Sequence, residues 1–172
     1  MKPVRLLFAA IAFASALPAA AQVAPTRDYT DMWFNPSESG WGISVRQKRP
    51  TGGSVDAMFS VWYTYDPRTS DTTTSGSGDF APLWFVMPGG TWTSSTTYTG
   101  GMYVVRGTTF SQAWVNCNTC ATLVGSYTFN FTDANNGTFT YAVTPPSGVA
   151  STDPAFGLST FSGVKTITRQ TF

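Results

Sequence analysis

The chain has no histidine, and Glu38 is its only glutamate among 172 residues. Without an imidazole it cannot form a Ser-His-Asp or Cys-His nucleophile, a His-liganded zinc centre or a His-based pH switch. Charged residues are also scarce, at 11% of the chain, and no basic patch indicates nucleic-acid binding. These shortages leave carboxylate chemistry as the enzymatic possibility to consider.

The longest hydrophobic run is at the N-terminus, where residues 1–21 have the pattern of a secretory signal peptide. Lys2 and Arg5 precede an apolar run, and three alanines supply a small-residue cleavage site. The run has about 12 residues, whereas a transmembrane helix needs ~20, so a retained anchor is the weaker alternative. We expect residues 22–172 to form one periplasmic or secreted domain with no membrane span.

Cysteine is limited to Cys117 and Cys120, in the sequence CNTC. In an exported protein such a close pair favours a disulfide that closes a small loop. A redox CxxC motif would precede a helix, but the β-rich sequence ATLVGSYTFNF follows here. A zinc knuckle would need two more thiolates or imidazoles. We therefore predict a disulfide, no metal and no cofactor.

Aromatic residues are abundant, at 15%, and they alternate with small polar residues at a period of two. This period predicts strands at 41–47, 57–65, 82–87, 100–107, 123–131, 138–143 and 164–170, with one more around Trp33. An Asn-Gly pair at 136–137 favours a tight hairpin turn. About eight consecutive antiparallel strands predict an all-β fold, a single up-and-down barrel, with a β-sandwich as the alternative. Residues 66–81, 144–163 and the CNTC region are expected to be loops.

The sequence NPSESGWG contains Glu38 and is expected to turn the chain at the mouth of the barrel. It lies between a strand that ends near Asn35 and one that begins near Trp41, with Pro36 and Gly40 shaping the connection. The simplest role for the Glu38 carboxylate is to cap backbone N–H groups of this turn. A glycosidase would need a second carboxyl about 5–10 Å away, and no spacing in the sequence brings one there.

Tryptophans supply most of the candidate ligand-binding residues. Trp62 and Trp84 are expected on the face opposite to the bulky residues of their strands, where they either cover the outside of the barrel or line a pocket. The alternative is packing in the core and at the rim. Arg46 is expected to be solvated. The candidate binding residues are Trp33, Asn35, Glu38, Trp41, Trp62 and Trp84, and no catalytic residue is assigned.

Several motifs, in order, resemble a group of exported bacterial proteins with an N-P-x-E-S-G-W-G signature. They are YTDMWFNPSESGWGISVRQ, FSVWYTYD, PLWFVMPGG, YTGGMYVV, VGSYTFNFTDANNGTFTYAV and KTITRQTF. The resemblance runs from about Tyr29 to Phe172 and implies an autonomous secreted β module, without catalytic residues. A fainter likeness to calycins and avidins depends on strand count and tryptophan placement, and is an analogy of fold.

The sequence favours a non-enzymatic barrel that binds a small molecule, a glycan or a protein at its open end. The alternatives are a glycan-active carboxylate enzyme using Glu38, and a structural or inhibitory partner protein. An outer-membrane barrel is a further possibility because the chain ends in Phe172. Against it, Thr166, Thr168 and Gln170 share the face of Phe172, where lipid would require apolar groups.

Overall fold

The computed structural model describes residues 23–49, 56–69, 80–116 and 121–171. In these ranges the chain forms strands and one short 3-10 helix. The elements are β1 (Asp31–Asn35), β2 (Glu38–Lys48), β3 (Ala57–Tyr65), η1 (Pro67–Thr69), β4 (Pro82–Met87), β5 (Thr91–Trp92), β6 (Thr97–Val105), β7 (Ala121–Phe131), β8 (Asn136–Val143) and β9 (Phe161–Arg169). None of the helical residues described here belongs to a segment long and apolar enough to cross a membrane. The predicted signal peptide, residues 1–21, and the predicted disulfide, Cys117 to Cys120, lie outside the described residues.

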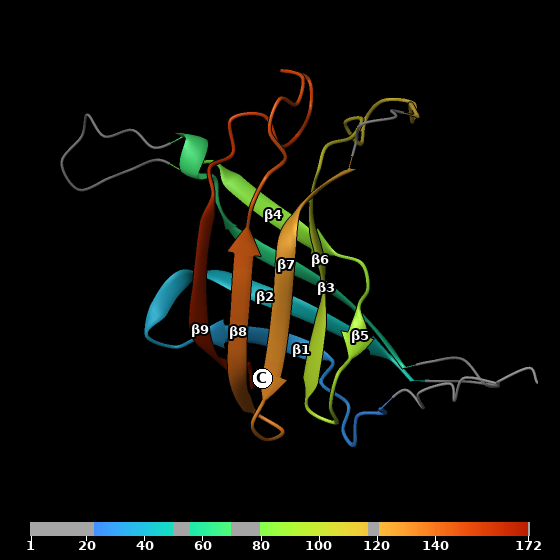
Figure 1. Ribbon diagram of the computed structural model, residues 1–172, viewed down its shortest axis with the longest axis vertical. Coiled ribbons are helices and arrows are strands. Elements are labelled where there is room, and N and C mark those ends of the chain that lie inside the picture. Colours follow the sequence, from blue (N-terminus) through green and yellow to red (C-terminus); the bar gives the residue numbers. More distant parts are fainter. Residues whose placement is uncertain (1–22, 50–55, 70–79, 117–120, 172) are drawn as a thin grey trace, which may run out of the picture.

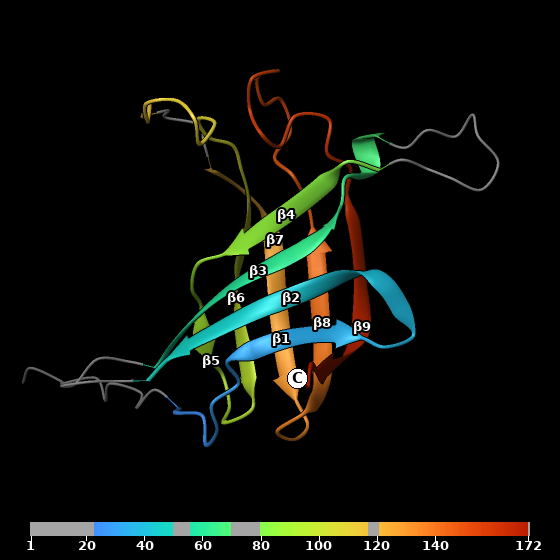
Figure 2. The same cartoon turned by 180° about the vertical axis from the view of Figure 1, so that it is seen from behind.

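Eight of the strands close into an antiparallel up-and-down barrel. The pairing runs β4-β3-β2-β1-β9-β8-β7-β6, and β6 returns to β4; β5 adds an extra strand beside β6. Figures 1 and 2 show the two sides of this barrel, with β6 to β9 on one side and β1 to β4 on the other. The predicted barrel is therefore confirmed, and the sandwich alternative is wrong.

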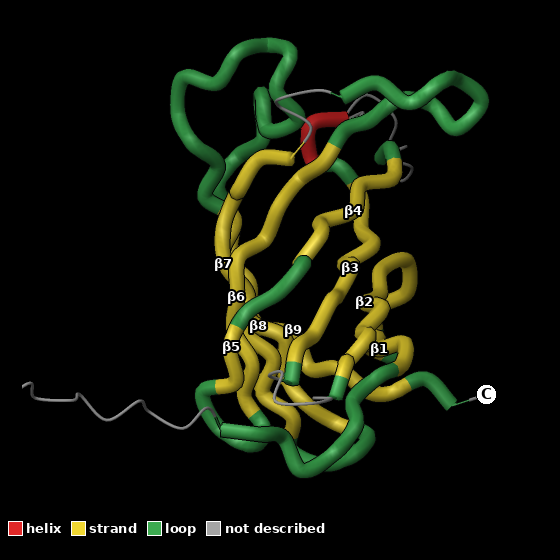
Figure 3. Tube along the Cα trace, turned by 90° about the vertical axis from the view of Figure 1, so that its right-hand side faces the viewer, coloured by secondary structure: helices red, strands yellow, loops and turns green. Residues whose placement is uncertain are grey.

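The barrel closes through two narrow seams. β1 pairs with β9 only at Trp33 and Phe34, and β4 pairs with β6 only at Phe85 and Val86. In Figure 3 the chain leaves β4 as a loop and reaches β5 beside β6, which keeps the β4–β6 pairing short. The other neighbouring strands of the barrel pair over longer stretches, so the fewest backbone pairs hold the wall at these two seams.

Side-chain alternation decides which residues face the interior. In β2 the predicted pattern holds: Ile43, Val45 and Gln47 are buried, and Arg46 is exposed as expected. In β3 the bulky face is the outer one, since Phe59 and Tyr63 are exposed while Trp62 is buried. Burial of large apolar side chains on one face of each strand stabilises the closed sheet by about 1.5–3 kcal/mol per residue.

One end of the barrel is filled by aromatic rings. Tyr29, which precedes β1, stacks on Phe131 with ring centroids 3.8 Å apart, and Trp33 lies 5.0 Å from Phe131. The Trp33 indole N–H donates to the Tyr29 carbonyl at 3.0 Å, and the Tyr29 N–H donates to the Gln47 side chain at 3.0 Å. We call this cluster, together with Phe129, the packed end. The segment before β1 therefore closes this end of the barrel.

Two local expectations are corrected by the structure. β8 begins at Asn136, so the Asn-Gly pair lies in a strand, and the turn before it is held by Asp133, which accepts hydrogen bonds from the N–H groups of Asn135 and Asn136. In β7 a bulge shifts the register, which leaves Leu123 exposed and Val124 buried. The strict alternation predicted for 123–131 is wrong at its first two residues.

Candidate functional site

A pocket of about 280 Å³ opens where β1 ends. β1 pairs with β9 at Thr168 and Arg169, and the rest of β9, from Phe161 to Ile167, extends beyond the end of β1. Among the described residues no strand pairs with this part of β9 on the β1 side. The pocket occupies the gap between β9 and the strands β2 and β3. Its lining residues are Glu38, Trp41, Trp62, Thr64, Tyr65, Pro67, Phe139, Tyr141, Ser159, Phe161 and Lys165.

Aromatic rings form most of the pocket wall. Trp62 lies at the floor, 4.8 Å from the ring of Tyr141 and 5.3 Å from that of Phe139, measured between centroids. Tyr141 and Phe161 are half-buried and complete the β8–β9 side. The ring of Tyr141 covers Gly163, where an added β-carbon would lie 2.6 Å from the Tyr141 hydroxyl. A glycine at that position is what lets the ring lie over β9.

The polar side of the pocket is an ion pair between Glu38 and Lys165. The Lys165 ammonium donates to Glu38 Oε2 at 2.8 Å, and the Trp41 indole N–H donates to the same oxygen at 3.1 Å. Among the residues that the structure describes, the other oxygen, Oε1, receives only a long contact of 3.5 Å from the side chain of Asn35. Glu38 thus binds side chains, and the expected role in capping the turn is wrong; the cap is the Asn35 side chain, which accepts from the Ser37 N–H at 2.9 Å.

Both ionisable groups are held in their charged forms. Hydrogen bonds from Lys165 and from Trp41 hold the pKa of Glu38 below its usual range. The same contact to Glu38 raises the pKa of Lys165. Because the two charges neutralise one another, the pocket has a polar side without a net charge from this pair. A carboxylate with a lowered pKa is also poorly suited to be a general acid.

The hairpin that carries Glu38 is built around Gly40. β2 begins at Glu38, earlier than expected, and the register between β1 and β2 shifts after Trp33, which leaves extra residues on β2. Gly40 has a φ of 98°, and an added β-carbon would lie 3.0 Å from the Tyr65 ring. Only glycine adopts this conformation readily. The extra residues allow Trp41 to reach the pocket.

The structure brings together some of the predicted site residues and separates others. Glu38, Trp41 and Trp62 line the pocket, and Asn35 is buried beside Glu38. Trp33 is fully buried in the packed end, outside the pocket lining, and its indole N–H is already bonded. Trp84 lies on the outer face, 49% exposed, and does not line the pocket.

The register between β3 and β4 explains why Trp62 and Trp84 are not on one face. Trp62 pairs with Phe85, and Tyr63 pairs with Trp84. Paired residues point to the same side of a sheet, so Trp84 shares the outer face with Tyr63. The expectation that both tryptophans contribute to one pocket is therefore corrected.

Lys165 is the most important site residue that the sequence analysis missed. It lies on the same face of β9 as Phe161 and Ile167, and that pattern is a signal that the cation points inward. An inward lysine needs a carboxylate, and Glu38 is the chain's only glutamate. Tyr141 and Phe161 carried no such signal, because an aromatic residue on an inner face is equally expected in a filled core.

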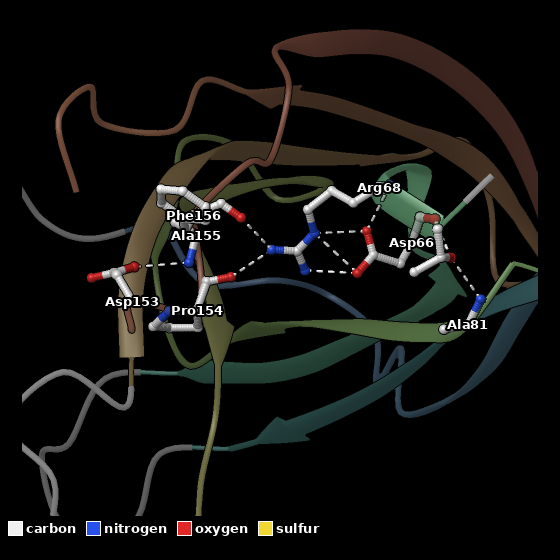
Figure 4. A network of polar contacts seen from close by, with 8 residues as sticks. Asp66, Arg68, Ala81, Asp153, Pro154, Ala155 and Phe156 are labelled. Carbon is white, nitrogen blue, oxygen red and sulfur yellow. Dashed lines mark hydrogen bonds and ion pairs between the residues drawn. The ribbon is translucent and has the colours of Figure 1, made fainter. Parts of the chain in front are cut away.

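A second polar network connects the segment that follows β3 with the loop between β8 and β9 (Figure 4). Arg68 is the second residue of η1, and its side chain donates three hydrogen bonds to the Asp66 carboxylate at 2.7–3.0 Å. The same guanidinium donates to the carbonyls of Pro154 and Phe156 at 2.9 Å each. Burial raises the pKa of Asp66, but the hydrogen bonds and charge of Arg68 outweigh it and hold the pKa below its usual range. We call this network the Arg68 clasp. It connects residues 154–156, in the loop between β8 and β9, to the segment that follows β3.

Within the described ranges, no three His, Cys, Asp or Glu side chains gather as a metal site would require. No family model, curated protein or solved structure matches this chain. The arrangement of the pocket itself is therefore the basis for a functional assignment.

Proposed function

We propose that the protein is a non-enzymatic, extracytoplasmic binding protein whose pocket takes one neutral sugar ring, as a free monosaccharide or at the end of a glycan. The observation that carries this proposal is the pairing of aromatic walls with the Glu38–Lys165 ion pair. At about 280 Å³ the pocket is near the lower end of the ~300–1,000 Å³ of small-molecule sites, so it suits a single ring.

The hydrogen-bonding capacity left over at the ion pair favours a neutral hydroxylated ligand. In the described residues Glu38 Oε1 has only the long contact to Asn35, and Lys165 uses one of its three N–H groups. Neighbouring sugar hydroxyls could donate to the first and accept from the second. An anion would be opposed by Glu38 and a cation by Lys165, whereas a neutral ring meets neither cost.

The rings of the wall supply the apolar contact that a sugar needs. The ring of Trp62 is buried at the floor, while Trp41, Tyr141 and Phe161 remain half-buried with surface still to cover. Large, stiff aromatic faces bind apolar C–H surfaces at low entropic cost. Hydrolysis is not supported: of the described residues that line the pocket, Glu38 is the one carboxylate, and glycoside hydrolysis uses two.

Titration of tryptophan fluorescence with D-glucose and with N-acetyl-D-glucosamine tests the proposal. We expect a saturable shift with at least one sugar, its loss in Trp62→Ala, and weakening of at least tenfold in Lys165→Met, which keeps an unbranched apolar chain but removes the donor. Trp114→Phe is the matched control, because Trp114 is 79% exposed and outside the pocket. Saturable binding of an uncharged apolar probe such as N-phenyl-1-naphthylamine, with no response to either sugar, would contradict the sugar assignment.

A further inference from the structure

A groove of about 430 Å³ on the outer face adjoins the pocket. Its lining residues are Met32, Trp33, Phe34, Gly40, Trp41, Gly42, Tyr63 and Gln170, and we call it the outer groove. Trp41 lines both cavities, and Gly40 in the groove lies against the ring of Tyr65 in the pocket. The two cavities therefore meet at the hairpin that carries Glu38.

Beside the outer groove, two exposed aromatic residues lie next to each other on neighbouring strands, Tyr63 on β3 and Trp84 on β4. Gly42 on β2 pairs with Tyr63 on β3, and Tyr63 pairs with Trp84 on β4. Tyr63 is 46% exposed and Trp84 is 49% exposed. Because Gly42 has no side chain, one flank of Tyr63 stays uncovered, and the groove has its floor there. Flat aromatic rings beside such a floor are suited to stack on sugar rings.

The charge of the groove limits what can occupy it. Its lining includes no Lys, Arg, Asp or Glu among the described residues, and Gln170 supplies the one side-chain amide. A polyanion such as nucleic acid would need cations along its path. A neutral ligand chain that leaves the pocket at Trp41 meets the groove next, and aromatic residues line both cavities.

We propose that the ligand is an oligosaccharide, with one unit in the pocket and the following units in the outer groove against Tyr63. This inference depends on the proposed function, since it extends the same ligand from the pocket. It predicts that a tetrasaccharide binds about tenfold more tightly than the corresponding monosaccharide, the size expected from one further stacked ring.

The sharpest test fills the groove and leaves the pocket intact. Gly42 has an ordinary strand conformation, and an added β-carbon would meet only the Trp33 carbonyl, at 3.4 Å, so Gly42→Val should fold. The matched control is Ser44→Val, two residues along the same face of β2 and outside the groove lining. Calorimetry would compare D-glucose with cellotetraose, and N-acetyl-D-glucosamine with chitotetraose, in the wild type, both variants and Tyr63→Ala.

The expected result is that Gly42→Val and Tyr63→Ala lower tetrasaccharide affinity to that of the monosaccharide, while Ser44→Val does not. Equal affinities of monosaccharide and tetrasaccharide in the wild type, or an advantage kept in both groove variants, would overturn the inference and leave the pocket proposal standing. Failure of all four sugars to bind would overturn both. If Gly42→Val instead changes the sedimentation coefficient and not the tetrasaccharide advantage, the groove is an interface between copies and the inference is wrong.

Discussion

The packed end and the pocket use the same residue types and reach opposite results. At the packed end the rings of Tyr29, Trp33 and Phe131 contact one another and are at most 1% exposed. In the pocket, Tyr141 and Phe161 are only half-buried although they too point inward. Composition therefore does not decide which part of this barrel is filled.

Strand length accounts for the difference. At the packed end β1 lies beside β9 through the pairs of Trp33 with Arg169 and Phe34 with Thr168, and the segment before β1 covers the opening. β1 has five residues and β9 has nine, so β9 extends beyond the end of β1. A cavity made in this way needs no small residues to create space, and its aromatic walls keep the ring surface that a ligand can cover.

The largest effect should come from removing a ring at the packed end. Phe131→Ala should lower the free energy of unfolding by about 3–5 kcal/mol, because it opens a cavity where neighbouring rings cannot collapse. Phe161→Ala, the same change in the pocket, should cost about 1–2 kcal/mol, because a half-buried ring loses less transfer free energy. Urea denaturation measured by far-ultraviolet circular dichroism would compare the two.

Similar costs for the two substitutions would contradict the comparison, since they would mean that the pocket is packed as tightly as the opposite end. Leu123→Ala controls for generic loss of an apolar side chain, because Leu123 is 52% exposed on the outer face. It should change stability by less than about 0.5 kcal/mol.

A smaller effect is expected from the Arg68 clasp, which connects η1 to the loop between β8 and β9. Arg68→Ala should lower stability by about 1–3 kcal/mol, since it removes charged hydrogen bonds to Asp66 and leaves two carbonyls without their donor. Arg106→Ala removes another exposed guanidinium and should have little effect.

The clasp should also give a signature at acid pH. Because the folded pKa of Asp66 is lowered, its contribution is present above the unfolded value of about 3.9 and is lost as pH falls through the folded pKa. The stability difference between wild type and Arg68→Ala should therefore shrink between pH 5 and pH 2, as measured by urea denaturation across that range. A difference that stays constant would show that the carboxylate is not the partner that matters.

The fold could be predicted from the sequence because hairpins are local. Period-two alternation and turns place each strand beside the next, so the barrel follows once eight such strands are counted. The inside and outside of β3 could not be predicted in the same way, because Phe59, Tyr63 and Trp62 make both faces bulky. The bulge at Val124 was equally hidden, since one extra residue in β7 leaves no mark in the sequence.

The site was predictable only in part, and the reason is distance along the chain. NPSESGWG identified Glu38 and Trp41 because they are neighbours. Trp62 was a candidate because it lies on the face of its strand opposite to the bulky residues, but the sequence left open whether that face is inside or outside. Lys165 lies 127 residues from Glu38, and only barrel closure through β1 and β9 brings them within 2.8 Å. The prediction that Trp84 lines the pocket was wrong for a related reason. The orientation of Trp84 depends on the register between β4 and β3, which the sequence leaves open.

The smallest effect should be that of pH on ligand affinity. The pKa of Glu38 is lowered and that of Lys165 is raised, so the ion pair is complete above about pH 4.3 and below about pH 10.4, the ordinary values of the two groups. Sugar affinity, measured by fluorescence titration, should therefore be constant within a factor of about two from pH 5 to pH 9. Glu38→Gln keeps an acceptor oxygen but leaves Lys165 without its carboxylate partner, so it should weaken binding and lower the pKa of Lys165. The loss of affinity at high pH would then begin at a lower pH than in the wild type. An affinity that falls between pH 5 and pH 9 in the wild type would mean that another titrating group contacts the ligand, and that the pair is not the polar recognition element.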